Sequence, residues 1–198
     1  MSALPQEQWT EQAYLEFERE AEIRHEFLDG QVIAMTGASR AHNLIASTTN
    51  FLLYSQLRNR PCEVYQSDMR VKVAASGLYT YPDIAVVCDK PQFLDDAVDT
   101  LLNPTLIIEV LSPSTESYDR GKKFQHYRQL DSLQDYVLIA QDQPRIECFA
   151  REKDNRWLLT EAVGLEQTIA LPSIACNLSL NDVYERITFG DETSDNKD

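Results

Sequence analysis

Residues 105–111, Thr-Leu-Ile-Ile-Glu-Val-Leu, form the most apolar stretch of this chain, and Glu109 interrupts it. A short run rich in β-branched residues and bounded by turn residues is typical of a buried central strand. A carboxylate inside such a strand is costly unless a cationic group compensates its charge. The stretch therefore predicts a core β-sheet that holds an acidic group together with a compensating cation.

A second strand-like segment, residues 81–88, shares this feature, because Asp83 stands at the start of its apolar run Ile-Ala-Val-Val-Cys. Two acids on neighbouring strands would converge on one cation, which favours an enzyme. Each acid alone also has a simpler interpretation. Asp83 could be a Pro-Asp turn residue, and Glu109 could form a structural ion pair with Lys123 or an arginine.

The length of 198 residues suits one domain with a well-formed core, which we expect over residues 1–190. Residues 191–198 are acidic and are expected to form a disordered tail. No apolar run approaches the roughly 20 residues that a membrane span needs. The N-terminus, Met-Ser-Ala-Leu-Pro-Gln-Glu, lacks the basic and apolar regions of a signal peptide. We therefore expect a cytoplasmic protein.

The formal net charge of −14 argues against a general nucleic-acid binder, because nonspecific affinity for DNA comes mainly from lysine and arginine at phosphates. It does not exclude an enzyme with a locally basic groove, or one whose metal ions supply the positive charge. The four cysteines are far apart and show no CxxC spacing. We expect buried free thiols rather than disulfides or a zinc site at Cys62, Cys88, Cys148 and Cys176.

The hydrophobic pattern along the chain predicts an α/β domain. Helices are expected over about 10–19, 40–58, 115–130 and 180–187. Strands are expected over about 24–28, 31–35, 63–66, 69–73, 81–88, 105–111, 136–140, 145–150 and 157–160. The first two strands form a hairpin around the turn Asp29-Gly30.

Two surface features are also expected. Arg70 and Lys72 alternate with apolar residues, so one face of their strand should lie in water. Residues 89–103 are acidic and irregular, which predicts a surface loop with a short helix.

The helix that follows Glu109 carries Asp119, Lys123 and Tyr127 at spacing i, i+4 and i+8, so these side chains share one face. A strand–turn–helix unit therefore places Glu109 just before a helix that can reach back with a lysine. Phosphodiester hydrolysis needs such a set, because oxygen ligands hold Mg²⁺, the metal activates water, and a lysine stabilises charge on the phosphate.

Pro82-Asp83 and Glu109 resemble the two halves of the PD-(D/E)XK nuclease pattern. This chain departs from the pattern at Leu111, where a lysine would be expected two residues after the second acid. Lys123 is the nearest replacement. Lys122 is the second candidate, although it does not share a helix face with Tyr127.

The wider sequence resembles the Uma-type family of putative restriction endonucleases, which belongs to the PD-(D/E)XK superfamily and was formerly a domain of unknown function. The resemblance covers roughly residues 10 to 187. Its motifs, in order, are Glu26-Phe-Leu-Asp-Gly30 with Met35, Arg40-Ala-His-Asn43, Tyr81-Pro-Asp-Ile84, Ile108-Glu-Val-Leu-Ser-Pro-Ser-Thr115, Asp119-Arg-Gly-Lys-Lys-Phe-Gln-His-Tyr127 and Asp135-Tyr-Val-Leu-Ile139.

The resemblance implies a restriction-endonuclease-like α/β fold, with a central mixed β-sheet flanked by helices and an N-terminal β-hairpin. It implies an endonuclease that depends on Mg²⁺ or Mn²⁺ and hydrolyses phosphodiester bonds, with DNA as the expected substrate. Asp83, Glu109 and Lys123 carry over as the catalytic set. Asp83, Glu109 and the backbone carbonyl of Val110 carry over as metal ligands.

Four further residues are candidates for supporting roles: Glu26, His42, Asp119 and Tyr127. Glu26 could approach the metal from the hairpin, and His42 could line a groove or serve the start of its helix. Asp119 could equally be an acid at the helix N-terminus, and Tyr127 a packing residue. The alternative function is a catalytically dormant nuclease fold that acts as a binding or assembly module. We expect a homodimer, because nucleases that cut both strands commonly pair two active sites.

Overall fold

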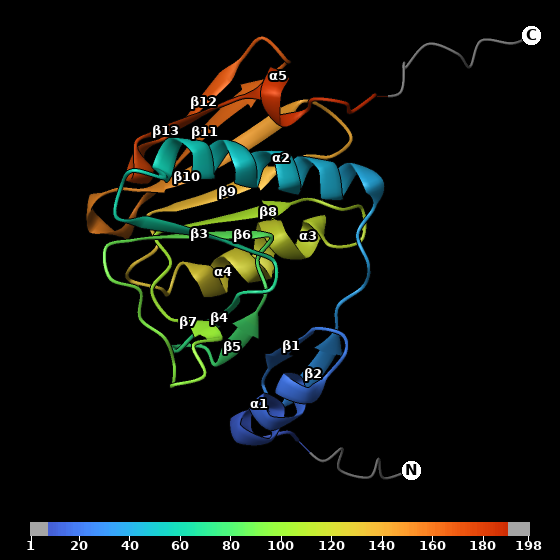
Figure 1. Cartoon of the computed structure of the whole chain (residues 1–198), viewed down its shortest axis with the longest axis vertical. Coiled ribbons are helices and arrows are strands. Elements are labelled where there is room, and N and C mark those ends of the chain that lie inside the picture. The colour runs from blue at the N-terminus through green and yellow to red at the C-terminus, as the bar shows by residue number, and fades with distance from the viewer. Residues whose placement is uncertain (1–7, 190–198) are drawn as a thin grey trace, which may run out of the picture.

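The computed structural model of this chain describes residues 8–189 (Figure 1). Its α-helices are α1 (Glu11–Glu20), α2 (Arg40–Leu57), α3 (Glu116–Tyr118), α4 (Phe124–Tyr127) and α5 (Leu180–Val183), with the π-helical turn η1 (Asp119–Lys123) and the 3₁₀ turns η2 (Lys153–Asn155) and η3 (Pro172–Ile174). Its strands are β1 (His25–Leu28), β2 (Gln31–Ala34), β3 (Cys62–Gln66), β4 (Arg70–Val73), β5 (Leu78–Thr80), β6 (Ile84–Cys88), β7 (Thr100–Leu101), β8 (Leu106–Val110), β9 (Asp135–Ile139), β10 (Arg145–Arg151), β11 (Trp157–Val163), β12 (Thr168–Leu171) and β13 (Cys176–Ser179).

A six-stranded sheet in the order β11-β10-β9-β8-β6-β3 forms the centre of the fold. Strands β8 and β9 are parallel, and the other neighbours are antiparallel. Helix α2 lies along one face of this sheet, and α3 and α4 lie on the other (Figure 1). The sheet is mixed and flanked by helices, as the sequence predicted.

The two faces of the sheet carry separate apolar cores because side chains alternate along each strand. Ile108 of β8 packs with Ile45 and Leu53 of α2 on one side. Ile107 packs with Tyr127 and the residues around it on the other side. Glu109 lies two residues after Ile107, so its side chain points to the same side of the sheet, toward α3 and α4. The predicted buried central strand is confirmed, since every residue of β8 is buried.

A second sheet, in the order β2-β1-β5-β4-β7, brings the N-terminal hairpin against the rest of the chain. Asp29 and Gly30 have φ values of 51° and 77°, the left-handed pair that a two-residue hairpin turn requires, and the predicted hairpin is confirmed. The hydroxyl of Thr10 accepts a hydrogen bond from the N–H of Ala13 and begins α1. The third sheet is the β12–β13 hairpin, which packs on the α2 side of the core with α5 (Figure 1).

The prediction of a wet face for the strand over 69–73 is wrong at Arg70, which is 2% exposed. Strand β4 lies between β5 and β7 in its sheet, and the Arg70 guanidinium lies over the rings of Tyr14, from α1, and Tyr81. The Arg70 guanidinium donates to the hydroxyls of Thr100 and Tyr81 and lies 3.0 Å from Asp99. Contacts to distant segments thus bury a charge that strand alternation assigned to solvent. The segment 89–103 itself contains the short strand β7 and no helix.

The prediction of four free thiols is also wrong in part. Cys62 and Cys88 form a disulfide, because they lie directly opposite each other on the antiparallel strands β3 and β6. Cys148 and Cys176 are buried and free, as predicted.

Two helices differ from their predicted bounds. The helix expected over 115–130 ends at Tyr127 and contains η1, and the last helix ends at Val183. Within residues 8–189, no helix is long and apolar enough to cross a membrane. The acidic tail predicted over 191–198 lies outside the described residues.

Candidate active site

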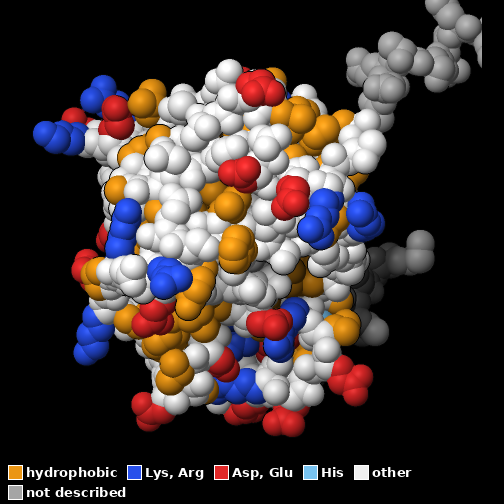
Figure 2. All heavy atoms as spheres, turned by 45° about the horizontal axis from the view of Figure 1, so that its top comes forward, with side chains coloured by type: hydrophobic (Ala, Val, Ile, Leu, Met, Phe, Trp, Pro, Cys, Tyr) orange, Lys and Arg blue, Asp and Glu red, His pale blue; other side chains and the backbone are white. Residues whose placement is uncertain are grey.

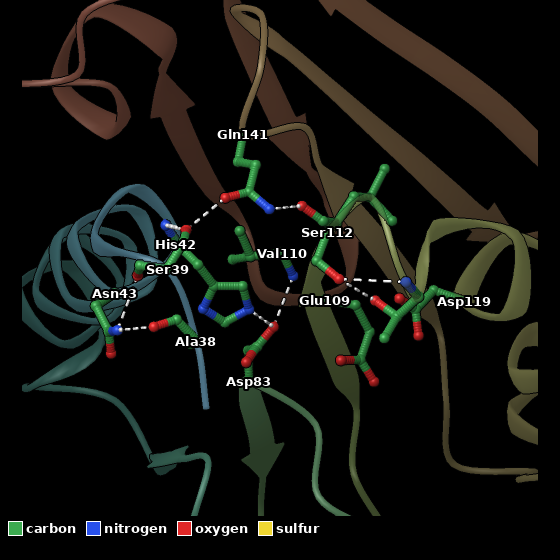
Figure 3. A network of polar contacts seen from close by, with 12 residues as sticks. Ala38, Ser39, His42, Asn43, Asp83, Glu109, Val110, Ser112, Asp119 and Gln141 are labelled. Atoms are coloured by element: carbon green, nitrogen blue, oxygen red, sulfur yellow. Dashed lines mark hydrogen bonds and ion pairs between the residues drawn. The ribbon is translucent and has the colours of Figure 1, made fainter. Parts of the chain in front are cut away.

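The two acids that the sequence singled out come from neighbouring strands. In the register between β6 and β8, Ile84 pairs with Ile108, so the residues one step beyond, Asp83 and Glu109, face each other. The N–H of Val110 donates a hydrogen bond of 2.7 Å to Oδ2 of Asp83 and ties the two strand ends together. The sheet therefore brings Asp83, Glu109 and Val110 to one edge (Figure 3).

Lys123 reaches this edge from the helical side. Its Nζ lies 2.9 Å from Oε1 of Glu109, 3.3 Å from Oε1 of Glu26 and 3.6 Å from Oδ1 of Asp119. Lys123 is buried, whereas the second candidate, Lys122, is exposed. One ammonium group thus contacts three carboxylates from three separate elements.

The helix over this site contains a π-helical turn, η1, in place of the regular α-helix that the spacing predicted. Such turns insert one extra residue per turn and occur frequently at functional sites. Asp119, Lys123 and Tyr127 are nevertheless all buried on the side of β8, so the predicted common face is confirmed.

Hydroxyl groups hold the carboxylates of the site in place. The Tyr127 hydroxyl donates a 2.8 Å hydrogen bond to Oε1 of Glu109, the oxygen that Lys123 also contacts. The Thr80 hydroxyl donates to Glu26, and the Tyr136 hydroxyl donates to the backbone carbonyl of Asp119. Tyr127 therefore contacts Glu109 directly.

His42 approaches Asp83 from α2. Its Nε2 lies 3.1 Å from Oδ2 of Asp83 (Figure 3). The side chain of Ser39 begins the helix by accepting a hydrogen bond from the N–H of His42. The same hydroxyl donates to Oε1 of Gln141, whose amide nitrogen donates to the carbonyl of Leu111 at 2.8 Å. These contacts fix the start of α2 against the ends of β8 and β9.

Sequence reasoning missed Ser39, Thr80 and Gln141. A serine before an apolar helix is a recognisable cap signal, and it could have drawn attention to Ser39. Nothing local marks Thr80 or Gln141, since each gains its role from a residue more than fifty positions away.

Burial and crowding of acids dominate the electrostatics of the site. Burial raises the pKa of Glu109 to about 8, with Lys123 opposing the shift and Asp119 and Asp83 adding to it. Burial also raises the pKa of Asp119. For Lys123, burial acts to lower the pKa, but the neighbouring acids outweigh it and hold the pKa well above its ordinary value. The acids of the site therefore outnumber its cations.

His42 follows the same balance. Burial acts to lower its pKa, but the hydrogen bond to Asp83 and the surrounding negative charge raise it. A positive charge at this edge of the sheet is thus stabilised from both sides, by Asp83 and by the Glu109 cluster.

The donor atoms at this edge are oxygens, the type of ligand that Mg²⁺ prefers. Mg²⁺ binds through one or two carboxylates and keeps several waters, and it takes oxygen ligands. Among residues 8–189, one oxygen of Asp83 and one of Glu109 have no hydrogen-bond partner. No three His, Cys, Asp or Glu side chains in the described part of the chain are gathered into a closed metal site. Two carboxylates, a carbonyl and water fit Mg²⁺ better than they fit zinc, which prefers nitrogen and sulfur.

Several known proteins resemble this chain in sequence or in fold. The sequence profile of the Uma2 family, described as "Putative restriction endonuclease", matches residues 11–182. Two proteins of Synechocystis sp. are similar in sequence. Uncharacterized protein sll1609 is 40% identical over 151 residues, which cover 76% of this chain and 85% of that protein. Uncharacterized protein slr1290 is 33% identical over 176 residues, which cover 89% and 91%.

A solved structure shares the fold. The crystal structure of a putative nuclease belonging to DUF820 from Anabaena variabilis superposes with a TM-score of 0.72 at 19% sequence identity. The superposition covers 89% of this chain and 98% of that one. The restriction-endonuclease-like α/β fold that the sequence predicted is therefore confirmed.

Proposed function

Since the chain belongs to the Uma2 family of putative restriction endonucleases, we propose that it is a metal-dependent endonuclease that hydrolyses phosphodiester bonds in DNA. The observation that carries this proposal is the position of Lys123, which contacts Glu109 from a helix while Asp83 faces Glu109 from the neighbouring strand. Two acids and a lysine at one sheet edge supply the groups that phosphodiester hydrolysis needs.

Asp83, Glu109 and the carbonyl of Val110 would hold Mg²⁺ or Mn²⁺. When bound, the cation supplies Lewis-acid stabilisation of charge on the phosphate and lowers the pKa of bound water. The ammonium group of Lys123 can donate hydrogen bonds to a phosphate oxygen or to the attacking water. Tyr127 and His42 hold Glu109 and Asp83 in one orientation each, which reduces the reorganisation needed on binding.

The net charge of −14 constrains how DNA would bind. Few lysine and arginine residues are available for phosphates, so a bound cation at the acidic edge would contribute much of the attraction.

The test is cleavage of plasmid DNA in the presence of Mg²⁺ or Mn²⁺. We expect Asp83→Ala, Glu109→Ala and Lys123→Ala to abolish cutting while circular dichroism shows a folded protein. Lys122→Ala is the matched control, because this adjacent lysine is exposed, and it should cut like the wild type. Cutting at the wild-type level by Asp83→Ala or Glu109→Ala would refute the assignment.

The alternative is a dormant nuclease fold that acts as a binding or assembly module. The acidic surface and the engagement of Lys123 with three carboxylates favour it. Calorimetry with Mg²⁺ and Mn²⁺ separates the two functions. Metal binding that is lost in Asp83→Asn supports the enzyme, and the absence of any binding supports the module.

A further inference from the structure

Helix α2 and the edge strand β3 carry an exposed aromatic surface remote from the candidate active site. Phe51 is 67% exposed and Tyr54 is 60% exposed, the highest values among the large hydrophobic residues described. A cavity of about 310 Å³ lies beside them, and Tyr54, Leu57, Arg58, Glu63, Val64 and Tyr65 are among its lining residues. We call this region, with Phe51, the α2–β3 surface. Figure 2 shows hydrophobic side chains gathered in a band on the face that it views, between scattered acidic and basic ones.

The composition of the α2–β3 surface is that of a protein interface. Aromatic residues and arginine are enriched at the centres of protein–protein contacts and dominate their binding energy. Strand β3 is the last strand of its sheet, and within residues 8–189 its outer edge has no strand partner. Two exposed aromatic side chains beside a cavity and an unpaired strand edge are typical of a surface that binds a partner protein.

The charges on this surface point to a second copy of the same chain. Arg58 and Glu63 both line the cavity and are both exposed. Within the described residues, Glu63 accepts a hydrogen bond from the Tyr65 hydroxyl and forms no ion pair, and the Arg58 side chain has no polar partner. In a twofold dimer, each contact occurs twice, so a surface that bears one acid and one base can be complementary to itself.

We propose that the α2–β3 surface is the interface of a twofold homodimer. Arg58 of each copy pairs with Glu63 of the other, and the exposed aromatic side chains of α2 in one copy fill the cavity of the other. The interface leaves the candidate active site open. Phe51 lies nine residues beyond His42 on the same helix and Arg58 sixteen, which is about 14 to 24 Å along its axis.

This inference rests on the surface and not on the proposed nuclease activity, so its test measures association alone. The full chain is studied by sedimentation velocity and native mass spectrometry at low micromolar concentration. We expect a dimer for the wild type. We expect the single variants R58E and E63R to weaken the dimer about tenfold or more, because like charges then meet across the interface.

The two single variants are then mixed in equal amounts. A twofold interface places both acids of one chain against both bases of the other, so the mixture should form a heterodimer with the wild-type affinity. The double variant R58E/E63R should also regain the dimer. No effect that acts only within one chain predicts recovery on mixing.

Phe51→Ser tests the aromatic part of the surface, and Leu158→Ser is its matched control. Leu158 is 53% exposed on β11, the strand at the opposite edge of the same sheet. We expect Phe51→Ser to weaken the dimer and Leu158→Ser to leave it unchanged. A monomeric wild type, a mixture that stays monomeric, or a dimer broken by Leu158→Ser and not by Phe51→Ser would each overturn the proposal.

Discussion

Replacing Glu109 by glutamine should remove a pH-dependent loss of stability. In the metal-free fold, burial raises the pKa of Glu109 from 4.5 to about 8. Between about pH 5 and about pH 7, the folded protein therefore keeps a proton that the unfolded chain releases. A carboxyl group whose pKa is higher in the folded than in the unfolded state makes the fold less stable as the pH rises. The Glu109 carboxyl therefore lowers the free energy of unfolding by about 1.4 kcal/mol per pH unit in this window.

Over that window Glu109 alone should lower the stability of the wild type by about 2 to 3 kcal/mol. Glu109→Gln cannot lose a proton, so its stability should decline less steeply, and it should overtake the wild type as the pH rises. Urea unfolding at both ends of the window, in the presence of a chelator, measures the two slopes.

Glu147→Gln is the matched control for this experiment. Glu147 is also a buried glutamate on a strand of the central sheet, and it pairs with Arg120 at 2.6 Å. Because this variant keeps Glu109, it should still show the decline in stability that Glu109 causes between about pH 5 and about pH 7. If Glu109→Gln and the wild type decline in parallel, then Glu109 is not protonated in the metal-free fold and the electrostatic reasoning is wrong.

Three further predictions concern metal binding and stability. Because Glu109 must lose its proton to bind a cation, calorimetry should show Mg²⁺ affinity rising as the pH increases toward 8, and an affinity that does not change would contradict this. Arg70→Ala should cost about 3 kcal/mol in urea unfolding, since it removes one of the two arginines that pair with Asp99 and leaves the Thr100 and Tyr81 hydroxyls without this donor, and a loss below about 1 kcal/mol would show that these contacts are unimportant. Reducing the Cys62–Cys88 disulfide, which joins positions 26 residues apart, should cost about 3 kcal/mol, and Cys62→Ser should match the reduced wild type.

The parts of the fold that were predictable depend on short-range patterns. The buried run around Glu109 predicted β8, the Asp29-Gly30 turn predicted the hairpin, and apolar spacing predicted α2 nearly to its ends. In each case the signal and the structure that it predicts lie within about twenty residues. The common face of Asp119, Lys123 and Tyr127 was predictable for the same reason.

The errors arise where distant segments decide the outcome. Arg70 is buried because Asp99, Thr100 and the rings of Tyr14 and Tyr81 surround its guanidinium, and alternation within a single strand contains no information about these contacts. The Cys62–Cys88 disulfide requires the register between β3 and β6. The contact of Ser39 with Gln141 spans 102 positions. Each of these features depends on the order of strands in the sheets, and that order cannot be predicted from local periodicity.

The position of the lysine follows from the alternation of β8. Leu111 lies two residues after Glu109, so its side chain falls on the same face, and it is buried in the apolar core with Tyr127. A lysine there would need its own compensation inside that core. Lys123 avoids this cost because its ammonium group enters from η1 and ends among carboxylates that already require a cation. Lys123 also contacts Glu26 of the N-terminal hairpin and so connects the hairpin to the site. The hairpin is thereby part of the site and not only an extension of the second sheet.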